Sequence, residues 1–203
     1  MKDVLRVYRK MQRLAPNTKF IVGNIANTAT LHAYDVAGIW AAKVGIGSGS
    51  VCTTRLVTGV GVPQASLLQE MVQSRNGVKS KIKIIADGGI KTIGDVSKAF
   101  VMGADYVMMG GALSGHKEGG IAPVDGLIDF QGSSAIQDKD YVTPEGITVS
   151  VLDKGPVDGT VKQILGGLRS TGSYINANLD SFHNRRDLLI QVRRQKNDIY
   201  EQS

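Results

Sequence analysis

Cys52 is the only cysteine in the chain and the residue best suited to act as a nucleophile. It lies in the glycine-rich segment GIGSGSVCTTR, where Thr54 and Arg55 follow it closely. A thiolate attacks electrophilic carbon, and a helix N-terminus or a neighbouring cation favours the thiolate over the thiol. A lone cysteine can also be a small buried apolar residue, so this segment leaves both interpretations open.

Glycine-rich turns follow three apolar runs of strand length and indicate a site for an anionic ligand. These turns are residues 45–50, the pair Gly88-Gly89 after Asp87, and the pair Gly110-Gly111. Glycine lets backbone amides approach a phosphate, and the N-terminus of the next helix adds its dipole. The turn before Cys52 also offers carbonyl oxygens that could hold a monovalent cation, although a glycine loop without an ion fits the pattern equally well.

The remaining polar candidates are histidines and one glutamate. His32, His116 and His183 lack the spacing of helical metal ligands, so we expect no transition-metal site, and we expect His116 on a solvated loop. Glu145 lies in the tight-turn sequence TPEG, which would present its carboxylate. An ordinary surface glutamate is the alternative interpretation.

A parallel α/β architecture must position these residues. The apolar runs are continuous rather than alternating, which is typical of strands buried on both faces, and they span residues 19–23, 41–45, 81–86 and 106–110. Helical patterns lie before and between them, at residues 5–14, 27–37, 64–74 and 92–102. We see no linker, so we expect a single domain over residues 1–203.

The chain changes character after Gly111. Residues 115–146 are rich in Gly, Asp, Ser and Pro, and their weak periodicity predicts a long loop such as a lid or binding loop. A helix is expected over residues 157–168, ended by the pair Gly166-Gly167. A short strand or helix is expected over residues 187–192.

Composition excludes several classes of protein. The 203 residues include 24 Lys and Arg against 18 Asp and Glu, a formal charge of +6, and 42% are hydrophobic, so the chain is not disordered throughout. The sequence contains no run of 18 apolar residues, so we expect no membrane-spanning helix. A single cysteine suits a cytoplasmic location. The basic tail lacks interleaved aromatic residues, so we expect neither nucleic acid nor membrane as a partner; its cations are Arg185, Arg186, Arg193, Arg194 and Lys196.

Three segments resemble the IMP dehydrogenase and GMP reductase family. They are KVGIGSGSVCTTRLVTGVGVPQ (43–64), IIADGGIKTIGDVSKAFVMGADYVMMGGALSGHKE (84–118) and ILGGLRSTGSY (164–174). The resemblance runs over nearly the whole chain and is weakest over residues 122–141. It implies a (β/α)8 barrel of the TIM type, of which this chain would hold strands five to eight, a catalytic loop at 45–63, a flap at 115–150, and a C-terminal helix and tail at 157–203.

The branch of the family is indicated by what lies between Gly132 and Glu145. No arginine occurs there, whereas the dehydrogenases carry an Arg-Tyr pair that activates water. GGLRSTGSY and the tail DLLIQVRRQKNDIYEQS are similar to GMP reductases, and there is no room for an inserted regulatory domain pair. VTPEGI and VTGVGVPQ are more similar to bacterial dehydrogenases. We therefore expect NADPH-dependent reductive deamination of GMP to IMP, with oxidation of IMP to XMP as the alternative.

The resemblance implies a role for each matching residue. Cys52 would form a thioimidate with purine C2, and Thr54 and Glu145 would pass protons to the departing amine. Asp87 would hold the ribose hydroxyls. The 5′-phosphate would be cradled by Gly88, Gly89, Gly110, Gly111 and Ser134. The other nucleotide contacts would be Ser50, Gly132, Ser133 and Gly146. Ser133 stands where the family usually has methionine.

A cofactor and a cation are implied in the same way. The residues that match the family's NADPH site are Ile46, Gly47, Ser170, Thr171, Gly172 and Ser173, and the last four would serve a neighbouring subunit. A potassium ion would be held by Gly47, Gly49, Cys52 and Arg55.

The implied barrel is longer than this chain, since such barrels have about 250 residues. We expect a shortened or split enzyme that pairs with a separate N-terminal half-barrel or with itself, and a homo-oligomer, which is a tetramer in the family. A non-catalytic fragment that binds purine nucleotide and docks on a full-length relative is the rival. A basic accessory protein for nucleic acid is a third possibility, which only the tail supports.

Overall fold

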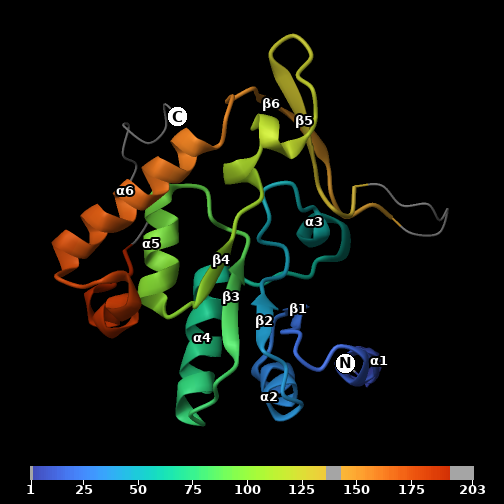
Figure 1. Cartoon of the computed structure of the whole chain (residues 1–203), viewed down its shortest axis with the longest axis vertical. Helices are drawn as coiled ribbons and strands as arrows, with labels where there is room; N and C mark the ends of the chain where they lie inside the picture. Colours follow the sequence, from blue (N-terminus) through green and yellow to red (C-terminus); the bar gives the residue numbers. More distant parts are fainter. Residues whose placement is uncertain (1, 136–142, 193–203) are drawn as a thin grey trace.

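A four-stranded parallel sheet forms the centre of the computed structural model, which describes residues 2–135 and 143–192. Its strands follow sequence order across the sheet (Figure 1): β1 (Ile21–Ile25), β2 (Ala41–Val44), β3 (Lys83–Asp87) and β4 (Tyr106–Met108). Ala41 pairs with Ile21 on one side and Lys83 on the other, and Ile85 pairs with Tyr106. All four strands overlap the predicted runs, to within two residues at either end. This confirms the parallel α/β class.

Helices precede β1 and connect the strands: α1 (Lys2–Leu14), α2 (Thr28–Val36), α4 (Gln64–Gly77) and α5 (Ile93–Met102). Asn27 caps α2, and Thr92 and Asp95 form a capping box on α5, so two of these helices begin where their sequence signals predict. One sheet face packs against them in a core that includes Leu31, Leu67, Met71, Val44 and Ile84.

Burial on both faces holds only for the two central strands. Every residue of β2 and β3 is buried or half-buried, whereas Ile21 of β1 is 50% exposed and Tyr106 of β4 is 45% exposed. Strands β1 and β4 each have one neighbour within the described residues, so their apolar side chains meet solvent. The prediction of uniform burial was therefore wrong at both edges.

An antiparallel hairpin stands beyond the carboxyl ends of the sheet, where the sequence analysis expected a loop (Figure 1). It consists of β5 (Leu127–Gln131) and β6 (Thr148–Leu152), with Phe130 opposite Val149. Its apolar residues alternate, with Ile128 buried, but the strands are short and the flanking Gly and Asp residues hid the period of two. The expected flap includes residues 136–142, which lie outside the described residues.

The helix α6 (Asp158–Ile175) continues past the pair that was predicted to end it. A Cβ added at Gly167 would lie 2.3 Å from Ile93 Cγ2, so this glycine permits the close approach of α6 to α5. The 3-10 helix η3 (Leu179–Leu188) follows and buries Phe182 between the same helices. Residues 187–188 end η3, and the expected separate element at 187–192 is not formed.

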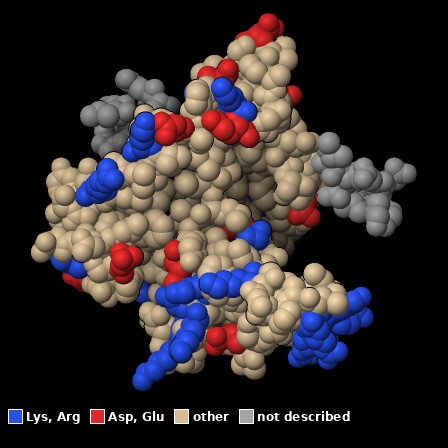
Figure 2. Space-filling model, in the orientation of Figure 1, with Lys and Arg blue, Asp and Glu red and all other residues tan. Residues whose placement is uncertain are grey.

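Positive charge gathers on α1 rather than only on the tail. Arg6, Arg9, Lys10 and Arg13 lie on one side of this helix, at the corner where Figure 2 shows a cluster of blue atoms. Residues 193–203 lie outside the described residues. No helix of residues 2–135 and 143–192 is both long and apolar enough to cross a membrane.

Candidate active site

The Cys52 loop (residues 45–63) leaves the carboxyl end of β2 and returns to the start of α4. Val62 N donates to Ile46 O at 3.2 Å and thereby closes the loop. The Arg55 side chain connects the two ends of the loop. Its Nη2 donates to Val62 O at 2.9 Å, and its side chain packs on Gly47 and Gly61. Arg55 therefore stabilises the loop through Val62.

Cys52 and Thr54 are in direct contact. The Cys52 Sγ donates a hydrogen bond to Thr54 Oγ1 at 3.2 Å, and Cys52 is half-buried. Thr54 begins the short helix α3 (Thr54–Thr58), which the sequence analysis did not predict. The arrangement leaves a thiol beside a hydroxyl that can pass on its proton.

Glu145 reaches the same place through its backbone. Thr53 N donates to Glu145 O at 2.9 Å, and Ile147 N donates to Val51 O at 3.0 Å. An antiparallel bridge between Cys52 and Gly146 lies between these contacts. The structure thus brings the backbone of Glu145 beside Cys52 and Thr54, from a segment far away in the sequence.

The predicted nucleotide contacts at residues 132–134 lie against this bridge. Gly132 N donates to Ile147 O at 3.0 Å, and Glu145 N donates to Ser134 O at 3.0 Å. A Cβ on Gly132 would lie 3.0 Å from Val51 O, and one on Gly146 would lie 3.1 Å from Ala135 N. Glycine suits both positions because a side chain would force neighbouring backbone to shift. Ser133 lies in the same turn, which Ala135 N closes by donating to Gly132 O.

Asp87 is held by two residues that the sequence analysis missed. Asn24 Nδ2 donates to Asp87 Oδ2 at 2.8 Å and to Gly45 O at 2.9 Å, and Lys43 Nζ lies 3.5 Å from the same carboxylate oxygen. All these residues lie near the carboxyl ends of neighbouring strands. Lys43, a charged residue inside the otherwise apolar run 41–45, was an available signal, whereas Asn24 lies just beyond the run 19–23.

The glycine turns meet Ser48 and Ser50. Ser48 Oγ donates to Asp87 O at 2.7 Å, and Gly89 N donates to Ser48 O at 2.8 Å, so this amide is already used within the protein. Gly88 has a φ of +81° and lies so close to Ser48 that a Cβ would come within 2.6 Å of its hydroxyl. A Cβ on Gly111 would lie 2.6 Å from Ser50 Oγ, and one on Gly110 would lie 3.4 Å from Phe130.

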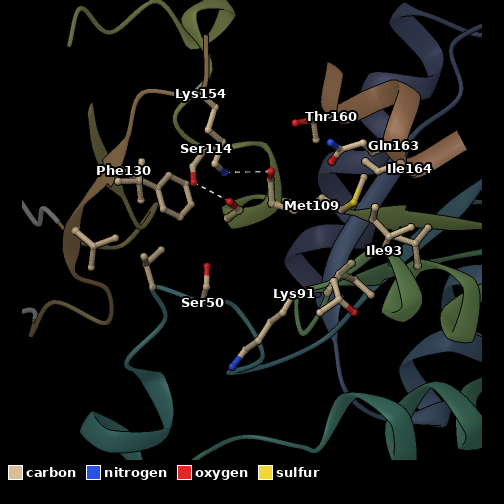
Figure 3. Close-up of a pocket in the computed structure, with 18 residues that line it drawn as sticks. Ser50, Lys91, Ile93, Met109, Ser114, Phe130, Lys154, Thr160, Gln163 and Ile164 are labelled. Carbon is tan, nitrogen blue, oxygen red and sulfur yellow. Dashed lines mark hydrogen bonds between the residues drawn. The ribbon is translucent and has the colours of Figure 1, made fainter. Parts of the chain in front are cut away.

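A cavity of about 560 Å³ opens beside these turns, and we call it the hairpin cavity. Figure 3 shows its walls, which come from the hairpin, the start of α5 and the first half of α6. Ser50 and Gly111 line it, so two of the predicted nucleotide contacts face the same cavity.

The predicted cofactor residues fall into two groups that do not meet in the described part of the chain. Ile46 and Gly47 lie in the Cys52 loop, whereas 170–173 lie on α6. The Thr171 hydroxyl is bonded to Ser97 and to Gly167 O, while Gly172 and Ser173 line a separate hollow between α6 and η3.

The predicted cation site gains no support from the loop geometry. The carbonyls of Gly49 and Arg55 already accept hydrogen bonds from Cys52 N and Gly59 N, and the Arg55 side chain packs on Gly47. A guanidinium beside the loop opposes a second cation. No group of three or more His, Cys, Asp or Glu side chains that could hold a metal occurs in the described ranges. Potassium therefore stays a prediction.

Two residues of the GHKEGG segment hold the start of α6, a role that the sequence analysis missed. His116 is 4% exposed, not solvated, and its Nδ1 donates to Gly155 O at 3.0 Å. The Glu118 carboxylate accepts from Val157 N at 3.0 Å, at the N-cap of α6. Both partners lie 39 residues away, so no local pattern could reveal them.

The fold and this site define a parallel α/β protein with a thiol and a hydroxyl beside glycine-rich turns at the carboxyl ends of its strands. Residues 1–196 match the family model of the IMP dehydrogenase / GMP reductase domain. The chain belongs to this family, as the resemblance implied.

Relatives named GMP reductase match almost all of the chain. The protein from Aeromonas salmonicida (strain A449) is 42% identical over 204 residues, which are 95% of this chain and 58% of that protein. The protein from Phytophthora infestans is 38% identical over 208 residues, which are 97% of this chain and 57% of that protein. The chain therefore spans somewhat more than half the length of these curated relatives.

A solved structure agrees with the sequence relatives. A GMP reductase variant from Trypanosoma brucei, in complex with guanosine 5′-monophosphate, matches with a TM-score of 0.79 and 34% identity. The match covers 89% of this chain and 40% of that chain. The α/β fold with its parallel sheet is thus similar to that of GMP reductase.

Proposed function

We propose that this chain carries the nucleotide-binding and reacting residues of an NADPH-dependent GMP reductase, which converts GMP to IMP and releases ammonia. The meeting of Cys52, Thr54 and Glu145 carries the proposal. The thiol donates to the threonine hydroxyl at 3.2 Å, and Glu145 O accepts from Thr53 N at 2.9 Å. The relatives named GMP reductase support the same reaction.

In the proposed reaction, the Cys52 thiolate attacks C2 of the guanine ring, and a C2–S bond forms as the bond to the exocyclic amine breaks. The amine must leave protonated, because an amide ion is not a feasible leaving group at neutral pH. Thr54 and Glu145 supply that proton, and ammonia departs. When bound, NADPH supplies the hydride that reduces C2; the C2–S bond then breaks and returns the thiolate. One GMP, one NADPH and two protons give IMP, NADP⁺ and ammonium.

The nucleotide is oriented by groups on both sides of Cys52. Asp87, fixed by Asn24 and Lys43, accepts from the ribose hydroxyls. Gly88, Gly89, Gly110, Gly111 and Ser134 cradle the 5′-phosphate, and Ser50, Gly132, Ser133 and Gly146 make further contacts with the nucleotide. Ile46 and Gly47 approach the nicotinamide end of the cofactor, while residues 170–173 receive the cofactor of a neighbouring subunit in a homo-oligomer.

The sheet needs further strands to become a barrel. We propose that β1 to β4 form one side of a (β/α)8 barrel whose other strands lie outside these 203 residues. Exposed apolar residues at both edges, Ile21 and Tyr106, support this, as does the 58% of the Aeromonas protein that the chain matches. The cytoplasmic location remains a prediction from cysteine usage.

Product analysis tests the proposal. The protein, with the strands that complete its sheet, is incubated either with GMP and NADPH or with IMP and NAD⁺, and the purines are separated by chromatography. We expect IMP and ammonia from the first mixture. XMP from the second would favour the dehydrogenase reaction, and GMP binding without either product would favour the non-catalytic nucleotide-binding role.

A further inference from the structure

The hairpin cavity contains two lysines and no carboxylate among the described residues that line it. Lys91 lies in the turn between β3 and α5, and Lys154 lies between β6 and α6. The other lining side chains are uncharged, so the two ammonium groups set the charge of the cavity at +2. A cavity lined by charge of one sign concentrates ligands of the opposite sign.

The walls strengthen that attraction. Much of the lining is apolar, and it includes Ile90, Ile93, Met109, Phe130, Val151 and Ile164. Low polarity around a charge raises its interaction energy with a counter-charge, and here the apolar walls flank two lysines that are themselves exposed. Figure 3 shows the Lys154 nitrogen directed into the cavity on one side of Ser50, and the Lys91 side chain extending past Ser50 with its nitrogen on the other side. An anion near Ser50 would be approached by both ammonium groups.

Both ammonium groups are free to bind a ligand. Neither lysine forms an ion pair within residues 2–135 and 143–192. Lys154 Nζ makes one long contact, 3.5 Å to Ala112 O, and an ammonium group has three protons to donate. The Lys91 backbone is fixed, because its N donates to Asp95 Oδ2 at 3.2 Å beside the capping box of α5.

We propose that Lys91 and Lys154 bind the 5′-phosphate of the nucleotide and make the site selective for a phosphomonoester dianion, an inference that rests on the proposed function. A phosphomonoester carries a charge between about −1.5 and −2 at neutral pH, which two lysines match. Ser50 and Gly111, two of the predicted nucleotide contacts, line the same cavity as both lysines. The backbone amides of the glycine turns supply only dipoles, so the lysines supply the compensating charge.

The test compares a ligand with the phosphate and one without it. Dissociation constants for GMP and guanosine are measured by calorimetry, without NADPH, for the wild type, Lys91→Ala, Lys154→Ala and the double variant. We expect each single variant to weaken GMP binding about tenfold and the double variant about a hundredfold, since a charge-assisted hydrogen bond contributes at least that much. Guanosine binding should stay unchanged. Lys10→Ala on the exposed face of α1 is the charge-matched control and should change neither constant.

The outcomes separate this inference from the proposed function. Lysine variants that bind GMP like the wild type would overturn the inference, as would variants that weaken GMP and guanosine equally. Lys91→Arg and Lys154→Arg should keep most of the GMP affinity, which distinguishes lost charge from a damaged cavity. A wild type that binds no GMP would instead contradict the proposed function.

Discussion

Asn24 Nδ2 holds Asp87 Oδ2 at 2.8 Å across the carboxyl ends of β1 and β3. The same nitrogen donates to Gly45 O at 2.9 Å, so one amide group ties the carboxylate to the base of the Cys52 loop. Lys43 Nζ, 3.5 Å from Oδ2, adds a positive charge. Within the described residues no hydrogen bond reaches Asp87 Oδ1, which leaves this oxygen for a ligand such as a ribose diol.

Replacing Asn24 should therefore weaken nucleotide binding through Asp87. We expect Asn24→Ala to raise the dissociation constant of GMP about tenfold, because a hydrogen bond to a charged group contributes about 1.5 kcal/mol or more. Asn24→Asp should be worse, since it sets a second carboxylate against the first. Calorimetry with GMP and with 2′,3′-dideoxy-GMP tests whether the loss of affinity depends on the ribose hydroxyls. Equal losses for the two ligands would show that Asn24 does not act through the ribose hydroxyls.

The Thr54 hydroxyl should matter for turnover more than for binding. Thr54→Val removes the oxygen that lies 3.2 Å from Cys52 Sγ while it keeps the shape of the side chain. We expect ammonia release to fall about a hundredfold, the lower range for a lost proton-transfer group, with the GMP dissociation constant within about twofold of the wild type. Thr54→Ser is the matched control and should retain most activity. A Thr54→Val enzyme with wild-type turnover would contradict the proton-relay role.

Adjacent glycines of α6 should respond in opposite ways to alanine. A Cβ at Gly166 meets nothing within 4 Å, whereas one at Gly167 would lie 2.3 Å from Ile93 Cγ2. We expect Gly166→Ala to stabilise the protein by about 0.5–1 kcal/mol and Gly167→Ala to destabilise it by about 1–3 kcal/mol. Urea unfolding measures both free energies. Ile93→Ala should relieve the Gly167→Ala variant, and a Gly167→Ala protein as stable as Gly166→Ala would disprove the close helix contact.

The Asp95 carboxylate makes the stability of the N-terminus of α5 depend on pH. Burial raises the pKa of Asp95, but hydrogen bonds from Thr92, Lys98 and the Lys91 backbone outweigh burial and lower the pKa below its ordinary value. Its stabilising contribution is therefore complete above the unfolded-state pKa of about 3.9 and is lost as pH falls through the lower folded-state pKa.

We expect Asp95→Asn to reduce the free energy of unfolding by about 0.3–1 kcal/mol at pH 7, as for a charge at a helix N-terminus, and the difference to shrink in acid. Urea unfolding of both proteins from neutral to acid pH measures this. Asp125→Asn is a suitable control, because Asp125 is exposed and lies outside the helices. A difference between wild type and Asp95→Asn that stays constant as pH falls would show that the charge contributes nothing.

The sequence predicted the parallel sheet and its capping signals because both are local. Continuous apolar runs located β2 and β3, and Thr92 with Asp95 located the start of α5. The hairpin was missed because its strands pair across a long insertion. The Gly166-Gly167 pair was misread because a glycine that ends a helix and one that admits a neighbouring helix look alike until the neighbour is known.

The candidate site shows the same division between local and long-range information. Cys52 and Thr54 are two positions apart, so their contact could be expected from the chain alone. Glu145 was a candidate from its tight turn, but its catalytic role came only from the family resemblance. Its place beside Thr53 depends on backbone pairing between segments far apart in sequence. Asn24, Lys43 and His116 were missed because their partners lie on other elements.

The most direct test of the central claim is ammonia release and NADPH oxidation on adding GMP, compared between the wild type and Cys52→Ala in the protein with its completing strands. We predict one ammonia per NADPH oxidised in the wild type and neither product in Cys52→Ala. Cys52→Ala should still bind GMP, because Asp87 and the hairpin cavity are separate from the thiol. Turnover by Cys52→Ala at the wild-type rate would contradict the account, because the attack on C2 would then not require this thiol.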